Sequence, residues 1–461
     1  MSIPRRKTSL RRARARGFTL TELMVALVMG LIVALASVAL ARSATLTFHE
    51  EVRTSSTEMA LRMGADRLRQ DLSRASFMST PNIVLDPKVA RLANVPDGDA
   101  NVARYAGILR LRGLRIDVGS TQFGVPAPLT DVGIVPDAVE IVGNMTSDDA
   151  YSGTITMNAG AGGGCANAQT ITLDPNADAA VYQLAGMSAS VPYDDTRFRN
   201  NARTAFQPVA GRRFLAQVTD AIGCHHYVPV CNVDVAGGRL AVTVSGDTNL
   251  RGVLYANSGS GVGGDSYENP AGGVARGCGS SEGGRVTIAP LSRVVWRLAL
   301  ATESMNASFH TEPGLGQVAK VDLVRQVIDF DGVAVGPPEV IAEYATDLKF
   351  GIVLDVPGAT GAARHVVYDM DTDNGNGSIF NATNGPNSIL PGQPGPQRVR
   401  SVRFRLAIRA AVADREVDLP TGVATSRARV CVDTATPCRK FARVRTVVSE
   451  VALTNQAGAF Y

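Results

Sequence analysis

A single apolar segment near the N-terminus constrains this chain more than any other feature. Residues 23–41 contain no charged side chain, and as a helix they would extend about 28 Å, close to the hydrocarbon thickness of a bilayer. The residues before Gly17 include no acid and seven bases: Arg5, Arg6, Lys7, Arg11, Arg12, Arg14 and Arg16. This charge bias predicts a single-pass membrane protein with a cytoplasmic N-terminus and an exported body. No second segment of this kind follows, which excludes a multi-span transporter.

The exported body is slightly acidic. Beyond Gly17 the chain contains 39 of its 46 Lys and Arg residues and all 42 of its Asp and Glu residues. A body with this balance has no general attraction to phosphate backbones. An aromatic content of 5%, with Trp296 as the one tryptophan, also argues against a base-stacking surface. General nucleic-acid binding is therefore disfavoured.

A short motif follows the basic leader directly. Residues 17–27 read GFTLTELMVAL, with Gly then Phe at a junction, an acid four residues after that Phe, and a long apolar run. This combination resembles the processing motif of type IV pilins and type II secretion pseudopilins, although Thr21 stands where an aliphatic residue is more usual. The resemblance implies that a prepilin peptidase removes residues 1–17 by cutting between Gly17 and Phe18, and that the new Phe18 amine is N-methylated. A conventional signal peptide cut near residues 39–43 would leave Glu22 unexplained.

The motif residues also have a physical interpretation of their own. Gly17 has no side chain and lets a peptidase approach an extended backbone closely. Glu22 favours a cationic partner in apolar surroundings, and in a bundle of such helices the nearest cation is the α-amino group of a neighbouring Phe18. This pairing would set the axial register of an assembly. The alternative is that Glu22 lies in the headgroup region of a plain membrane anchor.

Helical periodicity continues beyond the apolar segment. Residues 18–80 contain no proline, and an apolar stripe recurs at helical spacing: Leu61, Ala65, Leu68, Leu72 and Ala75. The sequence predicts one helix over residues 18–78, roughly 90 Å long, whose part 23–41 spans the membrane and whose second half packs on a head. Two helices broken near residues 42–43 are the alternative.

Past residue 100 the chain changes to short alternating or β-branched runs separated by turn residues, which predicts an α+β fold with a β-rich head in two regions, 79–285 and 286–461. The predicted strands lie within 107–118, 138–142, 153–157, 239–244, 293–300, 320–328, 347–354, 400–409 and 441–453. The order of segments 340–352, 401–409 and 443–455 resembles the C-terminal part of PilW-family minor pilins. Residues 159–284 resemble no family recognisable from sequence.

Six cysteines form an even set in an exported head, where disulfides are favoured: Cys165, Cys224, Cys231, Cys278, Cys431 and Cys438. The closest in sequence are Cys224 with Cys231 and Cys431 with Cys438, which leaves Cys165 for Cys278, although six cysteines allow 15 pairings. For the segment CHHYVPVC at 224–231, a zinc site is the alternative, because two Cys and two His are suitable ligands.

One loop has ligands for a metal ion. Asp369, Asp371 and Asp373 place three carboxylates at alternate positions beside flexible glycines, which suits Ca²⁺, although the same residues are common in solvated turns.

Two sequence patterns resemble catalytic motifs, but the segments around them do not have the secondary structure that those motifs require. The GxGxxG at 259–264 opens no helix, and the GxSxG at 279–283 lies between coil and strand. No catalytic residue is predicted, no cofactor other than calcium is suggested, and we expect no enzyme.

The resemblance implies a PilW-like minor pilin that acts in type IV pilus assembly or initiation. Its partners would be prepilin peptidase, other minor pilins, the major pilin, a tip adhesin and, before assembly, inner-membrane lipid, with the head in the periplasm and later on the pilus. A type II secretion pseudopilin is the nearest alternative. A third hypothesis is a pilus-mounted adhesin or DNA-binding subunit, for which the arginine-rich segments 110–115 and 398–409 are the candidates.

Overall fold

The computed structural model describes most of the chain between residues 19 and 457. The described residues are 19–89, 111–120, 122–124, 126, 129, 134–157, 168–207, 214–244, 283–300, 303, 320–330, 332–357, 363–370, 386–387, 395–413, 429–432 and 440–457. The chain divides into two compact units, residues 1–56 and residues 57–461.

One helix accounts for the described part of the first unit. The helix α1 (Leu20–Ser73) is continuous, so the predicted single helix is confirmed and the alternative break at 42–43 is wrong. Its first half contains apolar residues with good helix propensity and no proline, which explains its regularity. The helix ends at Ser73, five residues before the predicted end, because Ser76 and Met78 adopt left-handed backbone conformations (φ 61° and 50°) that no helix continues through.

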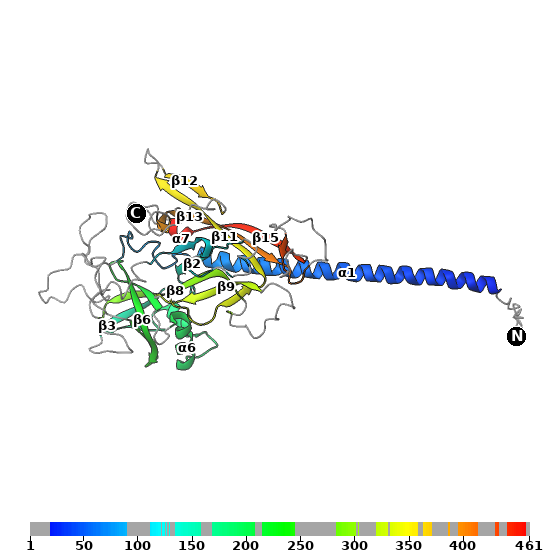
Figure 1. Ribbon diagram of the computed structural model, residues 1–461. Helices are drawn as coiled ribbons and strands as arrows, with labels where there is room; N and C mark the ends of the chain where they lie inside the picture. The colour runs from blue at the N-terminus through cyan, green and yellow to red at the C-terminus, as the bar shows by residue number, and fades with distance from the viewer. Residues whose placement is uncertain are drawn as a thin grey trace, which may run out of the picture. The chain divides into compact units, whose positions relative to one another are not determined.

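The second unit begins with the amphipathic part of α1, which supplies one stripe to the main core. All five residues of the predicted stripe are buried there, from 6% exposed at Leu61 to 0% at Leu68, Leu72 and Ala75. Residues from two sheets share this core, among them Trp296 and Phe350. Figure 1 shows β8 and β9 on one side of the helix, with β13 and β15 on the other.

The first sheet holds the helix through antiparallel strands that are far apart in sequence. The order β1–β2–β8–β9–β10 places a 16-residue strand, β8, at its centre. Its strands are β1 (Leu114–Asp117), β2 (Ala138–Gly143), β8 (Arg285–Leu300), β9 (Val321–Ile328) and β10 (Glu339–Ala342), and the 3-10 turn η1 (Val118–Ser120) follows β1.

The first half of β8 also belongs to a closed β-barrel. Its strands pair in the order β8–β3–β4–β7–β6–β5 and back to β8, all antiparallel, so the pairings leave no free edge. The barrel strands are β3 (Tyr151–Met157), β4 (Gln169–Leu173), β5 (Phe214–Thr219), β6 (His225–Ala236) and β7 (Arg239–Val244). Two helices, α5 (Ala179–Leu184) and α6 (Asp195–Phe206), pack into its core through Val181, Phe198 and Phe206.

The second sheet covers the other side of the amphipathic part of α1. Its order is β12–β11–β13–β15–β14. The strands are β11 (Ala345–Pro357), β12 (Ala363–Tyr368), β13 (Val399–Arg409), β14 (Arg429–Cys431) and β15 (Phe441–Ala452), with the 3-10 turn η5 (Pro396–Arg398) before β13 and the short helix α7 (Thr454–Ala457) after β15.

The α+β class is therefore confirmed, with a long N-terminal helix and antiparallel sheets. Each of the nine segments predicted to contain a strand overlaps a strand of the structure. The predicted division of the head at residue 285 does not separate two cores, because β2 from the first region and β13 from the second contribute to the same one.

Candidate functional site

The N-terminal end of α1 carries a reciprocal cap between Thr19 and Glu22. The Glu22 backbone N–H donates to Thr19 Oγ1 at 3.3 Å, and the Thr19 backbone N–H donates to Glu22 Oε2 at 3.0 Å. The Thr19 hydroxyl donates to the same Oε2 at 3.0 Å. This pattern, Thr followed three residues later by Glu, is a capping box, which satisfies two backbone donors that a helix start otherwise leaves free. The Thr-x-x-Glu spacing is the local sequence signal for this role of Glu22, which was not among the predictions from the sequence.

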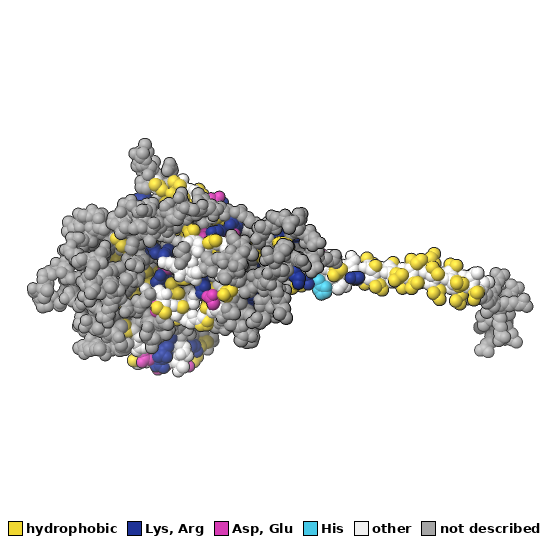
Figure 2. Space-filling model, in the orientation of Figure 1, with side chains coloured by type: hydrophobic (Ala, Val, Ile, Leu, Met, Phe, Trp, Pro, Cys, Tyr) yellow, Lys and Arg dark blue, Asp and Glu magenta, His cyan; other side chains and the backbone are white. Residues whose placement is uncertain are grey.

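Beyond the cap, α1 presents an apolar surface on every side. Large apolar side chains from Leu20 to Leu40 are between 54% and 79% exposed. Figure 2 shows hydrophobic side chains along this part of the helix. Among the described residues, α1 is the one helix long and apolar enough to cross a membrane. Within the apolar part, the Ser37 hydroxyl donates to Val33 O of the same helix at 2.8 Å. This surface suits lipid or other apolar helices.

A buried polar network fastens α1 to the first sheet. Asp71 lies on the buried side of the helix, and its Oδ2 accepts from Trp296 Nε1 at 2.9 Å and from Arg325 Nε at 2.7 Å. The Asp71 side chain is 4% exposed and that of Arg325 11%. A buried carboxylate needs a cation and donors, and these two partners supply both. The sequence did not predict this network. Its one local signal is that Asp71 directly precedes Leu72 of the apolar stripe.

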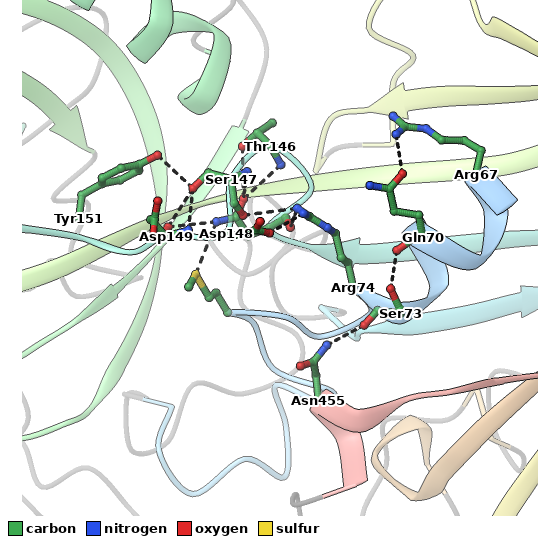
Figure 3. Close-up of polar contacts among 12 residues, drawn as sticks. Arg67, Gln70, Ser73, Arg74, Thr146, Ser147, Asp148, Asp149, Tyr151 and Asn455 are labelled. Atoms are coloured by element: carbon green, nitrogen blue, oxygen red, sulfur yellow. Dashed lines mark hydrogen bonds and ion pairs between the residues drawn. The ribbon is translucent and has the colours of Figure 1, made fainter. Parts of the chain in front are cut away.

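A second set of polar contacts holds the end of α1, and Figure 3 shows its members. Arg74 forms an ion pair with Asp148 and donates to Asn144 O at 3.3 Å. From α7, Asn455 Nδ2 donates to Ser73 O at 2.9 Å. The Asn455 amide thereby satisfies a carbonyl that the last turn of a helix leaves without a partner, and Arg74 ties the residue after the helix to the turn after β2. The turn after β2 and the C-terminal helix therefore both fix the helix end.

Two glycines allow the helix to approach the sheets closely. A Cβ added at Gly64 would lie 3.2 Å from Ala342 Cβ and 3.3 Å from Leu406 Cδ2, so the helix packs tightly where both sheets meet α1. A Cβ at Gly143 would lie 2.3 Å from the carbonyl oxygen of Arg74, which the backbone does not tolerate. The attachment is thus built from close packing as well as from polar contacts.

The cysteines require a correction. Cys224, Cys231 and Cys431 are disulfide-bonded. However, Cys224 and Cys231 flank the regular part of β6, in which His225 pairs with Thr219 and Val230 pairs with Phe214. At about 3.3 Å per residue their Cα atoms are roughly 20 Å apart, and a disulfide requires about 7 Å or less. The predicted Cys224–Cys231 pair is therefore wrong, and the zinc alternative fails because disulfide sulfurs are not thiolate ligands.

Several arginines of the two candidate segments have carboxylate partners within the head. On β13, Arg400 pairs with Asp355 at 3.0 Å and Arg405 with Asp347 at 2.9 Å. On β1, Arg115 lies 3.8 Å from Glu140. Burial raises the pKa of Glu140, but the surrounding arginines outweigh this and hold that pKa below its usual range. These three guanidinium groups thus pair with the head's own carboxylates, and the DNA-binding alternative stays a prediction.

Several predicted site residues lie outside the described part of the chain: Gly17, Phe18, Cys165, Cys278, Asp371, Asp373 and Cys438. Asp369 is described, and its Oδ1 accepts from the Met370 backbone N–H at 2.8 Å. The described residues contain no cluster of three or more ligands that could hold a metal ion. Calcium at residues 369–373 and the Cys431–Cys438 pair stay predictions. Because Cys224 and Cys231 are disulfide-bonded but not to each other, a Cys165–Cys278 pair is incompatible with Cys431–Cys438, and with the latter we expect Cys224 and Cys231 to pair with Cys165 and Cys278.

Comparison with known proteins gives one match. The prokaryotic N-terminal methylation motif matches residues 12–38, which include the Gly17–Phe18 junction, the capped first turn and most of the apolar segment. No curated protein and no solved structure matches the chain. The motif supports a type IV pilin-like or pseudopilin protein, which implies processing by a prepilin peptidase, membrane anchoring and assembly with other pilins.

Proposed function

We propose that this chain is a minor pilin of the type IV pilus machinery, PilW-like, and acts in pilus assembly or initiation as a structural subunit. One observation carries the proposal: a single continuous helix bears the matched motif at one end and enters the core of a β-rich head at the other. A plain membrane anchor would need neither the capped Glu22 nor a continuous helix.

Processing comes first in the proposed mechanism. The peptidase cuts between Gly17 and Phe18, the basic leader is lost, and the apolar helix stays in the inner membrane. The basic flank keeps the N-terminus cytoplasmic, so the head faces the periplasm until the subunit enters the filament. Lateral packing of the exposed apolar surface against sibling helices then replaces contacts with lipid.

Glu22 has the atoms for a role in register. Both bonds from Thr19 end on Oε2, so within the described part of the chain Oε1 has no partner. A neighbouring Phe18 amine can pair with Oε1 while the cap stays intact. In an apolar bundle such a pair is favoured only when the two helices are at the correct axial offset, because an unpaired charge there is costly.

The head is held firmly enough to follow its helix. Asp71, Trp296 and Arg325 form a buried network between α1 and the first sheet, and Asn455 holds the helix end from the C-terminal side. A displacement of the amphipathic part of α1 would have to break these contacts together. The head is therefore suited to be carried by the helix during assembly.

The experiment that tests the proposal is intact-mass measurement and N-terminal sequencing of the protein extracted from native membranes, compared with Gly17→Glu. We expect a native chain that starts at methylated Phe18 and a variant that keeps its leader. A start near Ser43, or an uncut Met1, would contradict the proposal. Deletion of the gene separates the two machineries: loss of surface pili supports the minor pilin, whereas normal piliation with lost protein secretion supports the pseudopilin.

A further inference from the structure

The capping box has a consequence for the bond that precedes it. Thr19 is not helical and Leu20 is the first residue of α1, so the helix begins two residues after the Gly17–Phe18 junction. Three hydrogen bonds between Thr19 and Glu22 fix this boundary. An N-cap residue has non-helical backbone angles, which prevents the helix from continuing toward the N-terminus.

The leader sequence makes such a boundary necessary. Residues 10–16 read LRRARAR, and Leu, Arg and Ala are among the strongest helix formers. Once a helix exists, adding a residue at its end is much easier than starting a new one. A helix that begins in residues 20–24 would therefore tend to extend through residues 17 and 18 into the leader, opposed only by the weak helix propensity of Gly17 and by the cap at Thr19.

We propose that Thr19 is a positioning residue for leader removal: its cap makes α1 begin at Leu20, so that the helix does not extend to the Gly17–Phe18 bond that the peptidase cuts. A peptide bond inside a helix has its N–H and C=O engaged and its side chains radiating around an axis. A peptidase that requires an extended substrate must first melt it. The inference rests on the proposed function, because it concerns the same processing step.

The test is the rate of leader removal from the full-length precursor in inner-membrane vesicles that contain the prepilin peptidase, followed by the mass shift of the chain. Thr19→Val has the same shape but no oxygen that can accept the Glu22 N–H, and we expect it to be cut about five-fold more slowly, the size typical for loss of an N-cap. Thr19→Ser and Thr19→Asn both keep a capping oxygen and should be cut at close to the wild-type rate. Asn differs from Thr in shape, so its rescue would show that capping matters and not resemblance to Thr.

Two further variants separate the cap from other effects. Glu22→Gln keeps an acceptor for the Thr19 N–H and should be cut faster than Glu22→Ala, because Gln also serves in capping boxes. Thr45→Val is the matched control, since it makes the same exchange in the same helix where the hydroxyl donates only to Ala41 O at 2.8 Å, and it should leave the rate unchanged.

The outcomes distinguish the inference from the proposed function. Rates that follow capping ability, with Ser and Asn fast and Val slow, support the inference. A Thr19→Val precursor cut at the wild-type rate overturns it, and so do Ser and Asn precursors cut as slowly as Val, because the peptidase would then recognise Thr itself. A wild-type precursor that is never cut after Gly17, or a Gly17→Glu precursor that is cut normally, overturns the proposed function and the inference with it.

Discussion

Replacement of Asp71 by Asn tests the attachment of the helix to the head most directly. The exchange keeps the size of the side chain but removes the negative charge that both Trp296 Nε1 and Arg325 Nε contact. The Arg325 side chain is 11% exposed. Without the Asp71 charge, its one carboxylate contact among the described residues would be Glu339 Oε2 at 3.9 Å. Removal of one partner from a buried ion pair typically costs about 3–5 kcal/mol, because the other charge stays buried without compensation.

The assay uses a probe that lies in the network itself. Trp296 is the single tryptophan and is 0% exposed, so its fluorescence reports unfolding of the head core in urea. With a urea dependence of about 3 kcal/mol per M, a loss of 3–5 kcal/mol lowers the midpoint by roughly 1–1.7 M.

The matched control is Asp66→Asn. Asp66 is on the same helix and pairs with Arg69, but its side chain is 68% exposed and that of Arg69 42%. An exposed pair contributes about 0–1 kcal/mol, so the midpoint should move by about 0.3 M at most. If Asp71→Asn shifts the midpoint no more than Asp66→Asn does, the buried network does not hold the helix to the sheet, and the reasoning is refuted.

Two further predictions concern packing and pH. Gly143→Ala places a Cβ 2.3 Å from Arg74 O and should destabilise the head by about 1–3 kcal/mol or more, whereas Gly30→Ala, with nothing within 4 Å, should leave the urea midpoint unchanged; equal midpoints would contradict the close approach. Burial holds the pKa of His225 below its ordinary 6.5, so its contribution to stability is complete above about pH 6.5 and is lost as the pH falls toward the folded-state pKa. The wild-type midpoint should therefore fall between about pH 7 and pH 5 more steeply than that of His225→Gln, and identical slopes would show that His225 is not responsible.

The sequence allowed the helix to be predicted almost completely, for a physical reason. Amphipathic periodicity depends only on residues near each other along the chain, and the five stripe residues from Leu61 to Ala75 are all buried as expected. The end of the helix was misplaced because it is set by a distant contact, in which the Ser76 backbone N–H donates to Val142 O. Local pattern cannot reveal a stop of this kind.

The barrel was the part of the fold that sequence reasoning did not anticipate. Its strand β6 contains Pro229, which normally argues against an internal strand, and a register shift between Val230 and Asn232 interrupts its alternation. Its closure depends on β8, whose first half pairs with β3 and β5 while its second half belongs to the other sheet. Such sharing of one strand has no signature in local sequence.

The candidate site shows the same contrast between local and distant contacts. The capping box joins residues three apart and could have been found from Thr19 and Glu22 alone. The Asp71 network joins residues separated by 225 and 254 positions, so no local pattern identifies Trp296 or Arg325 as its partners. The capping box at the processing end can therefore be recognised from the sequence alone, whereas the Asp71 network that attaches the helix to the head is found only from the structure.

The geometry of Glu22 connects processing with assembly. Both bonds from Thr19 end on Oε2, and Oε1 has no partner within the described part of the chain, so a neighbouring amine can be bound without loss of the bonds that define the first turn. If assembly required the cap to open, each subunit would lose helix stability when it gained the ion pair, and the loss would offset part of the gain. Because the cap and the proposed ion pair would act through different oxygens, the same carboxylate could serve both the helix start and the proposed axial register.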